Sequence, residues 1–300
     1  MINGLINVYK EPGFTSFDVV AVMRGITGQK KIGHTGTLDP MAEGVLPICL
    51  GNATKLADML KDKKKEYIAT FKLGERTDTL DITGEILERR KVSAKASDIF
   101  EAVKSFEGGY DQLPPMYSAK WVDGKRLYDL ARKGIEIERN PVFVSIYEIE
   151  VLKLEIPFVT IRVLCSKGTY IRSLCEDIAK KIGEISVMTS LKRTRVSNFT
   201  AETSHKLSEL SELKKAGLLT KTVIPTDFAF EEYPVFTVKK EFRKAIDNGN
   251  KLRYTEVEPE FNLSKGQIVR IYNDENRFTG LYEAVFNEEN LKPYKMFLEN

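Results

Sequence analysis

The segment Gly33–Lys55 constrains this chain more than any other, and its sequence is GHTGTLDPMAEGVLPICLGNATK. The segment contains four glycines in a stretch of nineteen residues, so its backbone can turn tightly and approach a ligand closely. Asp39 precedes a proline, which favours turn or extended geometry and lets the carboxylate project from the loop. The apolar run Val45–Leu50 follows and predicts a strand. The segment therefore predicts a loop suited to a ligand, leading into a strand.

The rest of the pattern mixes strands and helices without a regular alternation. Alternating apolar residues predict strands at 67–73 and 158–164, and the clearest helical spacing runs from Ile171 to Ile182. Because these elements do not repeat as βαβ units, we expect an α+β fold and not a doubly wound sheet.

Two domains are expected from the length of 300 residues and from a change of character after Asp227. The segment 1–230 is predicted to be one domain. Short strands separated by turns, such as Asn248-Gly249, predict a small β-rich domain over 231–300.

Composition excludes several classes of protein. Three cysteines without a C-x-x-C pair and two histidines argue against a disulfide scaffold and against a metal site, and a reducing cytoplasm fits them best. No apolar run approaches the ~18 residues of a membrane span, and the N-terminus does not resemble a signal peptide. We therefore expect a cytoplasmic protein that contacts no membrane.

Charge is informative only when it is divided along the chain. The net charge is +3, with +5 on residues 1–230 and −2 on residues 231–300. Within the first part, basic residues predominate in 162–195 and in the cluster Lys61–Lys65. A solvated charged face explains either cluster alone, but two clusters with aromatic residues nearby favour a nucleic-acid groove.

A lone carboxylate such as Asp39 acts as a nucleophile only where a cation keeps it ionised and oriented. Arg172, at the start of the clearest helix, is the candidate cation, because an arginine can grip a carboxylate in fixed geometry. Tyr67 and Tyr170 are candidates for stacking on a nucleobase. The plainer alternatives are a simple Asp-Pro turn, a surface arginine and two structural tyrosines.

Two other motifs point to different chemistry. The spacing Gly28-x-x-x-x-Gly33 is close to a phosphate-binding loop, but His34 stands where the phosphate-binding lysine belongs, which disfavours a nucleotide hydrolase. Asp78 and Asp81 could suggest a metal, although a turn ending at Gly84 explains them better.

Several segments together resemble one family, the bacterial TruB-type tRNA pseudouridine-55 synthases. The long G-H-T-G-T-L-D-P block is the most specific of them, and one departure is Phe17, at a position where a polar residue is common. The segments are Lys10–Ser16, Gly33–Lys55, Tyr67 with Leu73-Gly74 and Thr77–Gly84, Pro114–Ala119, Ser166–Leu174 and Leu191–Thr194.

The resemblance implies a fold and a reaction. The fold has a central mixed, largely antiparallel sheet flanked by helices, followed by a PUA-like RNA-binding domain. The enzyme would detach uracil-55 from its ribose in the T-arm of tRNA, turn it and rejoin it through C5. It would need no cofactor and no metal, and it would act as a monomer without an obligate protein partner.

The resemblance also implies residue roles. Asp39 matches the catalytic aspartate and Arg172 the arginine paired with it. Tyr67 matches the tyrosine that packs on the flipped base, with a role in proton transfer left open. An insertion at about 113–140 would clamp the T-arm. The remaining residues would contact the substrate, and they are His34, Tyr170, Leu191, Lys55, Lys64 and Asp81. An RNA chaperone with a degenerate site is the non-enzymatic alternative, which the joint presence of Asp39, Tyr67 and Arg172 disfavours.

Overall fold

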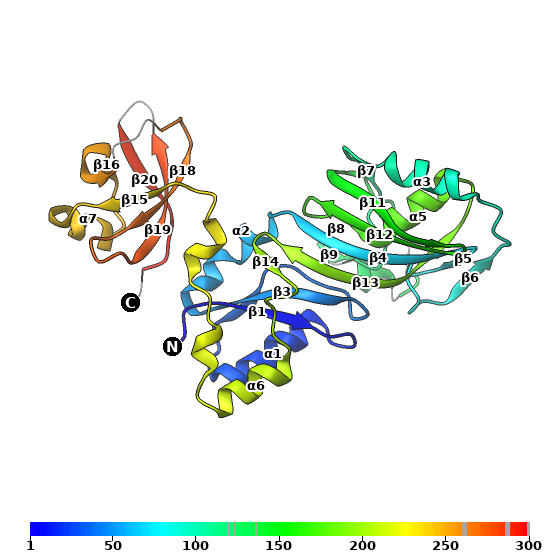
Figure 1. Cartoon of the computed structure of the whole chain (residues 1–300), viewed down its shortest axis with the longest axis horizontal. Coiled ribbons are helices and arrows are strands. Elements are labelled where there is room, and N and C mark those ends of the chain that lie inside the picture. Colours follow the sequence, from blue (N-terminus) through cyan, green and yellow to red (C-terminus); the bar gives the residue numbers. More distant parts are fainter. Residues whose placement is uncertain are drawn as a thin grey trace.

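A computed structural model describes residues 1–118, 121–122, 124–131, 133–135, 137–259, 263–285 and 289–298. Figure 1 shows a large sheet with helices around it and a smaller β-rich unit at the C-terminal end. The helices of the larger part are α1 (Ser16–Thr27), α2 (Ala57–Lys61), α3 (Ala96–Lys104), α4 (Leu127–Ala131), α5 (Ile171–Lys181) and α6 (Leu207–Lys215). No helix in these ranges is long and apolar enough to cross a membrane.

The large sheet is mixed and mainly antiparallel. Its strands run in the order β1-β3-β13-β4-β12-β11, with β2 paired to β3 and β14 to β13. Among the described strands of this sheet, β3 and β13 are the one parallel pair. This confirms the predicted α+β fold with a largely antiparallel central sheet. The strands are β1 (Gly4–Lys10), β2 (Ile32–His34), β3 (Glu43–Leu50), β4 (Lys65–Leu73), β11 (Ile146–Glu155), β12 (Phe158–Cys165), β13 (Ser186–Val196) and β14 (Phe199–Thr200).

Alternation along the strands divides the sheet between separate cores. Ile6 and Val8 of β1 pack with α1 and α6, whereas Leu5 of the same strand faces the cluster shared with the C-terminal unit. Helices α3 and α5 cover the other half of the sheet, where Phe71 and Ile161 are fully buried. Since successive side chains of a strand point to opposite faces, one strand serves two cores. Figure 1 shows both helix pairs against the sheet.

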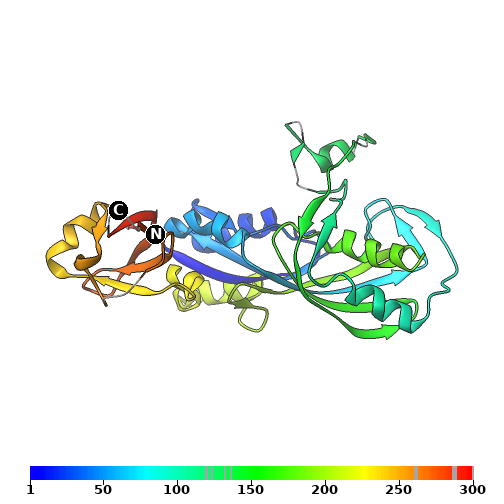
Figure 2. The ribbon, with the colours of Figure 1, turned by 90° about the horizontal axis from the view of Figure 1, so that it is seen from above.

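Smaller strand pairs flank the sheet. They are β5 (Glu75–Thr77) with β6 (Ile86–Arg89), β7 (Tyr110–Gln112) with β10 (Val142–Val144), and β8 (Trp121–Val122) with β9 (Lys125–Arg126). In Figure 2 the segment between β7 and β10 projects from the main body. This segment is the predicted insertion at 113–140, of which residues 119–120, 123, 132 and 136 lie outside the described residues.

The C-terminal unit is built on a separate six-stranded sheet, as expected for a small β-rich unit. It packs on the larger part through Leu281 and Phe297, which share a cluster with Leu5, Phe199 and Phe230. Its elements are β15 (Val235–Val238), α7 (Arg243–Asp247), β16 (Leu252–Arg253), β17 (Val257–Glu258), β18 (Ile268–Tyr272), β19 (Phe278–Val285) and β20 (Asn290–Met296).

Candidate active site

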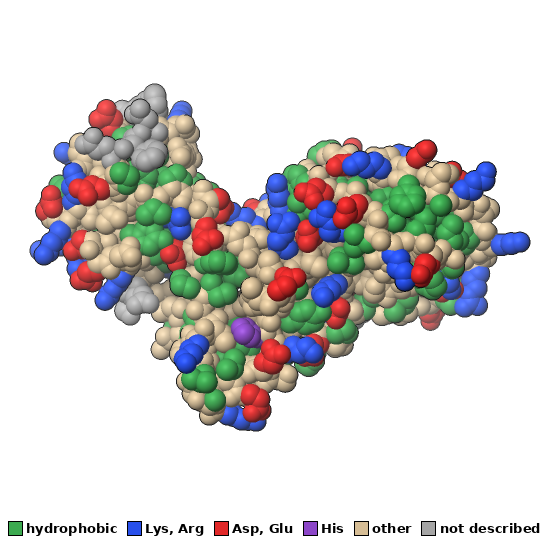
Figure 3. All heavy atoms as spheres, viewed as in Figure 1, with side chains coloured by type: hydrophobic (Ala, Val, Ile, Leu, Met, Phe, Trp, Pro, Cys, Tyr) green, Lys and Arg blue, Asp and Glu red, His purple; other side chains and the backbone are tan. Residues whose placement is uncertain are grey.

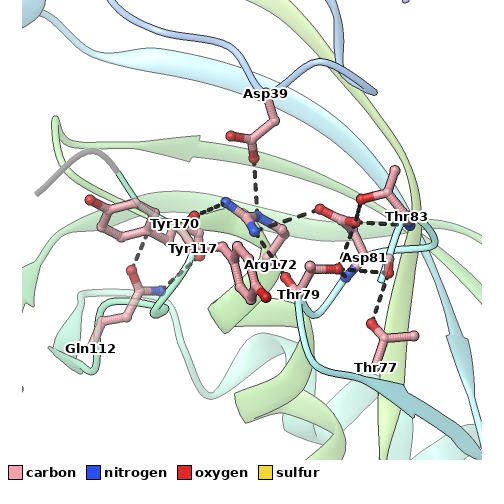
Figure 4. Close-up of polar contacts among 9 residues, drawn as sticks. All are labelled: Asp39, Thr77, Thr79, Asp81, Thr83, Gln112, Tyr117, Tyr170 and Arg172. Atoms are coloured by element: carbon pink, nitrogen blue, oxygen red, sulfur yellow. Dashed lines mark hydrogen bonds and ion pairs between the residues drawn. The ribbon is translucent and has the colours of Figure 1, made fainter. Parts of the chain in front are cut away.

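Asp39 and Arg172 meet at the centre of the site. Asp39 lies in the loop between β2 and β3, and Arg172 lies in the first turn of α5. The Nε of Arg172 is 3.0 Å from Oδ2 of Asp39, as Figure 4 shows. The arginine side chain is 6% exposed and the aspartate side chain 34%, so a buried cation holds a carboxylate that is still partly accessible. The predicted pair is therefore formed.

Three further acceptors hold the guanidinium of Arg172. Its Nη1 donates to the carbonyl of Thr79 at 2.9 Å and lies 3.6 Å from Oδ2 of Asp81. Its Nη2 donates to the carbonyl of Tyr117 at 2.8 Å, at the base of the insertion. A planar guanidinium with this many fixed partners cannot rotate away from Asp39.

Asp81 is buried, with 4% of the residue exposed. Its Oδ1 accepts from the hydroxyl and the backbone N–H of Thr83 and from the hydroxyl of Thr79. Figure 4 shows Asp81 and these bonds to the right of Arg172, whereas Asp39 lies above it. Asp81 therefore acts as a second counter-charge for Arg172, a role that its place in an apparent turn did not suggest.

Burial and the neighbouring charges of Arg172 and Asp81 together shift the pKa of Asp39. Burial raises the pKa of Asp39 above its usual value, Arg172 opposes this rise, and the negative charge of Asp81 adds to it. A carboxylate with a raised pKa is a better base and nucleophile than an exposed one, provided that its cation keeps it ionised.

Tyr67 and Leu191 form an apolar wall beside this pair. Tyr67 lies on β4 and Leu191 on the neighbouring β13, and both are less than a tenth exposed. They share one core cluster with Leu38 and Ile171, which directly precede Asp39 and Arg172 in sequence. Burial raises the pKa of the Tyr67 phenol, with a smaller opposing effect from Arg193.

Tyr170 is held by an amide that the sequence did not single out. Gln112 is 1% exposed; its Oε1 accepts from the backbone N–H of Tyr170 at 2.8 Å, and its Nε2 donates to the carbonyl of Tyr170 at 3.0 Å. Nε2 also donates to the hydroxyl of Tyr110, which donates to Asp177. Figure 4 shows Gln112 beneath Tyr170. This network fixes the backbone from which the Tyr170 ring projects.

Two buried cations fix the loop that carries Asp39. Lys10 is fully buried and donates to the carbonyls of Pro40 and Ala42, and burial lowers its pKa to about 8. Arg193, 1% exposed, donates to the carbonyls of Gly36, Thr37 and Val45. The sequence signal for these two roles was a lysine at the end of an apolar strand and an arginine inside another strand.

Three other residues predicted to contact the substrate, His34, Lys64 and Lys55, lie outside the contacts of Asp39 and Arg172. His34 ends β2, and burial together with Lys61 and Arg193 lowers its pKa. Lys64 is exposed, with its Nζ 4.0 Å from the centre of the Tyr147 ring. Lys55 is exposed and donates to the carbonyl of Met296 in β20, which places it at the junction with the C-terminal unit. Within the described residues no group of three or more His, Cys, Asp or Glu side chains is arranged to hold a metal ion.

Comparisons with known proteins show the family. Residues 24–171 match the family model for the N-terminal domain of TruB family pseudouridylate synthases, and residues 172–231 match that for the C-terminal domain of tRNA pseudouridylate synthase B. The chain is 50% identical over 310 residues to the tRNA pseudouridine synthase B of Lachnoclostridium phytofermentans, covering 99% of this chain and all of the relative. It is 45% identical over 298 residues to that of Clostridium acetobutylicum, covering 98% and 99%.

Solved structures show the same fold at lower identity. A crystal structure of a Cbf5-Nop10-Gar1 complex contains a chain with a TM-score of 0.77 and 28% identity, covering 98% of this chain and 85% of that one. A structure of an H/ACA RNP bound to a substrate RNA containing 2'-deoxyuridine contains another, with a TM-score of 0.76 and 27% identity, covering 99% and 85%. From its matched models, its relatives and its fold, this chain belongs to the TruB family of pseudouridylate synthases.

Proposed function

We propose that this chain isomerises uridine-55 in the T-arm of tRNA to pseudouridine, with Asp39 as the catalytic nucleophile. The coarser statement, that it is an enzyme forming pseudouridine in tRNA, follows from its family and its curated relatives. The observation that carries the finer proposal is the 3.0 Å ion pair between Asp39 and the buried Arg172, beside an apolar wall. A tRNA substrate also implies the cytoplasm.

The target base has to leave its stack before its glycosidic bond can be reached. Extrusion costs a few kcal/mol, which stacking and phosphate contacts offset. Tyr67, Tyr170 and Leu191 supply flat and apolar surface where the base would enter. Because burial keeps the Tyr67 phenol protonated at neutral pH, we assign Tyr67 to packing against the base.

The reaction is balanced without any external reactant. The bond between N1 and C1′ breaks, the uracil turns while held in the pocket, and a bond forms between C5 and C1′. The proton on C5 is then lost, and N1 gains one. Asp39 attacks or stabilises the detached fragment, and Arg172 keeps its carboxylate ionised and aimed. No electrons are exchanged with a partner, so the steps require no redox cofactor.

The domain organisation supports a division of labour. We assign residues 1–230 to catalysis, with the insertion at about 113–140 as a clamp, and residues 231–300 to a PUA-like RNA-binding domain. The matched family models end at residue 231, and a separate sheet follows from Val235. Because this last part carries −2, it must bind RNA through a few placed residues and not through bulk charge. We expect the protein to act as a monomer.

Two experiments test the assignment of uridine-55 as the target. One maps pseudouridine in tRNA from cells that lack the protein, and the other treats an unmodified tRNA transcript with purified protein. We expect position 55 to stay uridine in the first case and to be converted in the second. Conversion at another position would overturn the site assignment, and tight tRNA binding without any product would favour the RNA-chaperone alternative.

Affinity for tRNA should depend strongly on salt. The face drawn in Figure 3 mixes both signs of charge, and Arg162 is engaged by Glu66, Glu148 and Glu150, so only part of the predicted basic groove is free for phosphates. Lys65 is also turned inward, donating to the carbonyls of Lys61 and Lys63.

With several phosphate contacts remaining, we expect the Kd to rise by roughly 10²-fold or more between 50 and 200 mM salt. Lys64→Ala should reduce the slope of log K against log salt by about one, whereas the buried Lys65→Met should leave the slope unchanged. A slope near zero in filter-binding measurements would contradict a phosphate-binding groove.

Gln112→Leu should impair catalysis through Tyr170. The leucine leaves the backbone N–H of Tyr170 without its acceptor, whereas the carbonyl keeps the bond from the N–H of Leu174. An unmet buried donor costs about 1–3 kcal/mol, and its loss loosens the backbone that carries the ring. We expect kcat to fall about ten- to a hundredfold, with a smaller change in KM. The matched control is Tyr110→Phe, which cuts the link to Asp177 but keeps both bonds to Tyr170. Equal loss in both variants would show that Gln112 serves only general stability.

A further inference from the structure

Phe17 is the large apolar side chain that α1 leaves in solvent near the catalytic loop. The residue is 65% exposed, whereas Val19, Val20 and Met23 of the same helix are buried in the core. Its ring lies 5.5 Å from the ring of His34, centroid to centroid, and the two planes are at 89°. An exposed ring at this position contributes nothing to the core, so its place and its partner are informative.

Hydrogen bonds fix the start of α1 to the loop that carries Asp39. Ser16 Oγ accepts from the backbone N–H of Leu38 at 2.9 Å, and the N–H of Gly13 donates to the carbonyl of Pro40 at 2.9 Å. Thr15 caps the helix with a complete capping box. Phe17 therefore directly follows Ser16, which is bonded to Leu38, the residue before Asp39. These bonds hold the backbone of Phe17 close to the loop of Asp39.

His34 completes a corner made of two flat rings. Its Nδ1 accepts from the backbone N–H of Gly36 at 3.3 Å, which leaves the ring proton on Nε2. Burial, Lys61 and Arg193 lower its pKa, so the imidazole is neutral at pH 7. Two perpendicular aromatic planes, one of them largely exposed, offer one face for stacking and one edge for lateral contact.

We propose that Phe17 stacks on an unpaired nucleobase of the RNA substrate, other than the base that enters the pocket of Asp39, and so adds a second ring to the substrate contact expected of His34. The proposal rests on the function proposed above, because an RNA bound for reaction at Asp39 has to pass over this loop. Base-on-aromatic stacking tolerates any base and is the usual way in which proteins hold unstacked nucleotides. A protein partner is disfavoured because the ring adjoins the loop over which RNA must lie.

Tryptophan substitution gives a direct readout of stacking. Phe17→Trp and the matched control Val22→Trp place an indole at two exposed positions of α1, Val22 being 38% exposed. Wild-type protein, with Trp121 as its single tryptophan, supplies the background signal. On titration with a T-arm stem-loop RNA we expect strong quenching of the indole at position 17 and no change beyond background at position 22. Equal quenching at both positions, or at neither, would overturn the proposal.

Affinity measurements add a second test. Phe17→Ala should raise the Kd for the same RNA and the KM for tRNA about five- to fiftyfold with kcat changed less than about threefold, Phe17→Tyr should restore both, and Val22→Ala should match wild type. Unchanged affinity of Phe17→Ala would overturn the proposal even if wild-type protein converts uridine-55. Position-specific quenching together with conversion at another uridine would instead overturn the proposed target and leave the corner intact.

Discussion

Asp39→Asn is expected to lower the rate of pseudouridine formation by at least about 10⁴-fold, as loss of a catalytic nucleophile does elsewhere. The amide keeps the size and polarity of the side chain but cannot attack or stabilise a detached fragment as an anion. Arg172 keeps Asp81 and two backbone carbonyls, so the site should stay assembled. The Kd for tRNA should therefore remain within about tenfold of the wild-type value.

Release of tritium from C5-labelled uridine in tRNA measures this loss, and filter binding measures the Kd. The pKa of Asp39 is raised in the folded protein, so the ionised carboxylate lowers the free energy of unfolding at neutral pH. Asp39→Asn should therefore match or exceed the wild-type Tm. Tritium release near the wild-type rate would overturn the nucleophile assignment.

Arg172→Met should damage both stability and catalysis. It removes the ion-pair partner of the buried Asp81 and of the partly buried Asp39, and it removes the hydrogen bonds that Arg172 donates to the carbonyls of Thr79 and Tyr117. Removing one partner of a buried ion pair costs about 3–5 kcal/mol of the free energy of unfolding. Urea unfolding measures this cost. The control is Lys180→Met on the same helix, because Lys180 is exposed and its ion pair with Glu176 within one helix is expected to be worth less than about 1 kcal/mol.

The conservative variant Arg172→Lys separates catalysis from stability. A lysine cannot meet Asp39, Asp81 and two carbonyls at once, so Asp39 loses part of the opposing charge and its pKa should rise further. In the proposed mechanism activity requires the ionised carboxylate, so it is expected to be lost as pH falls through this pKa. The acid limb of kcat against pH should therefore move to higher pH than in wild type. A limb that does not move would show that Arg172 leaves the ionisation of Asp39 unaffected.

Local patterns predicted much of the fold because they report local preferences. The strand β4, with its strict alternation, and the helix α5, with its apolar stripe, were found close to their observed bounds. The strand β13 was not predicted, because polar and basic residues interrupt its apolar positions. Its Arg193 is buried, and this burial is possible because backbone carbonyls accept its hydrogen bonds. Burial of such a residue depends on acceptors from the distant Gly36–Val45 stretch, which no local pattern displays.

The sequence by itself determined the family resemblance and the loop that carries Asp39, because both are contained in contiguous motifs. The same motifs made candidates of Asp39, Arg172, Tyr67, Tyr170 and Leu191. Only the tertiary structure decided what surrounds them. It brought Asp81 and Tyr117 to Arg172, Gln112 to Tyr170, Lys10 and Arg193 to the loop, and Phe17 to His34. The physical reason is that a buried charge or amide is tolerated only where remote backbone groups meet its hydrogen-bonding needs, and the folded chain alone sets those distances.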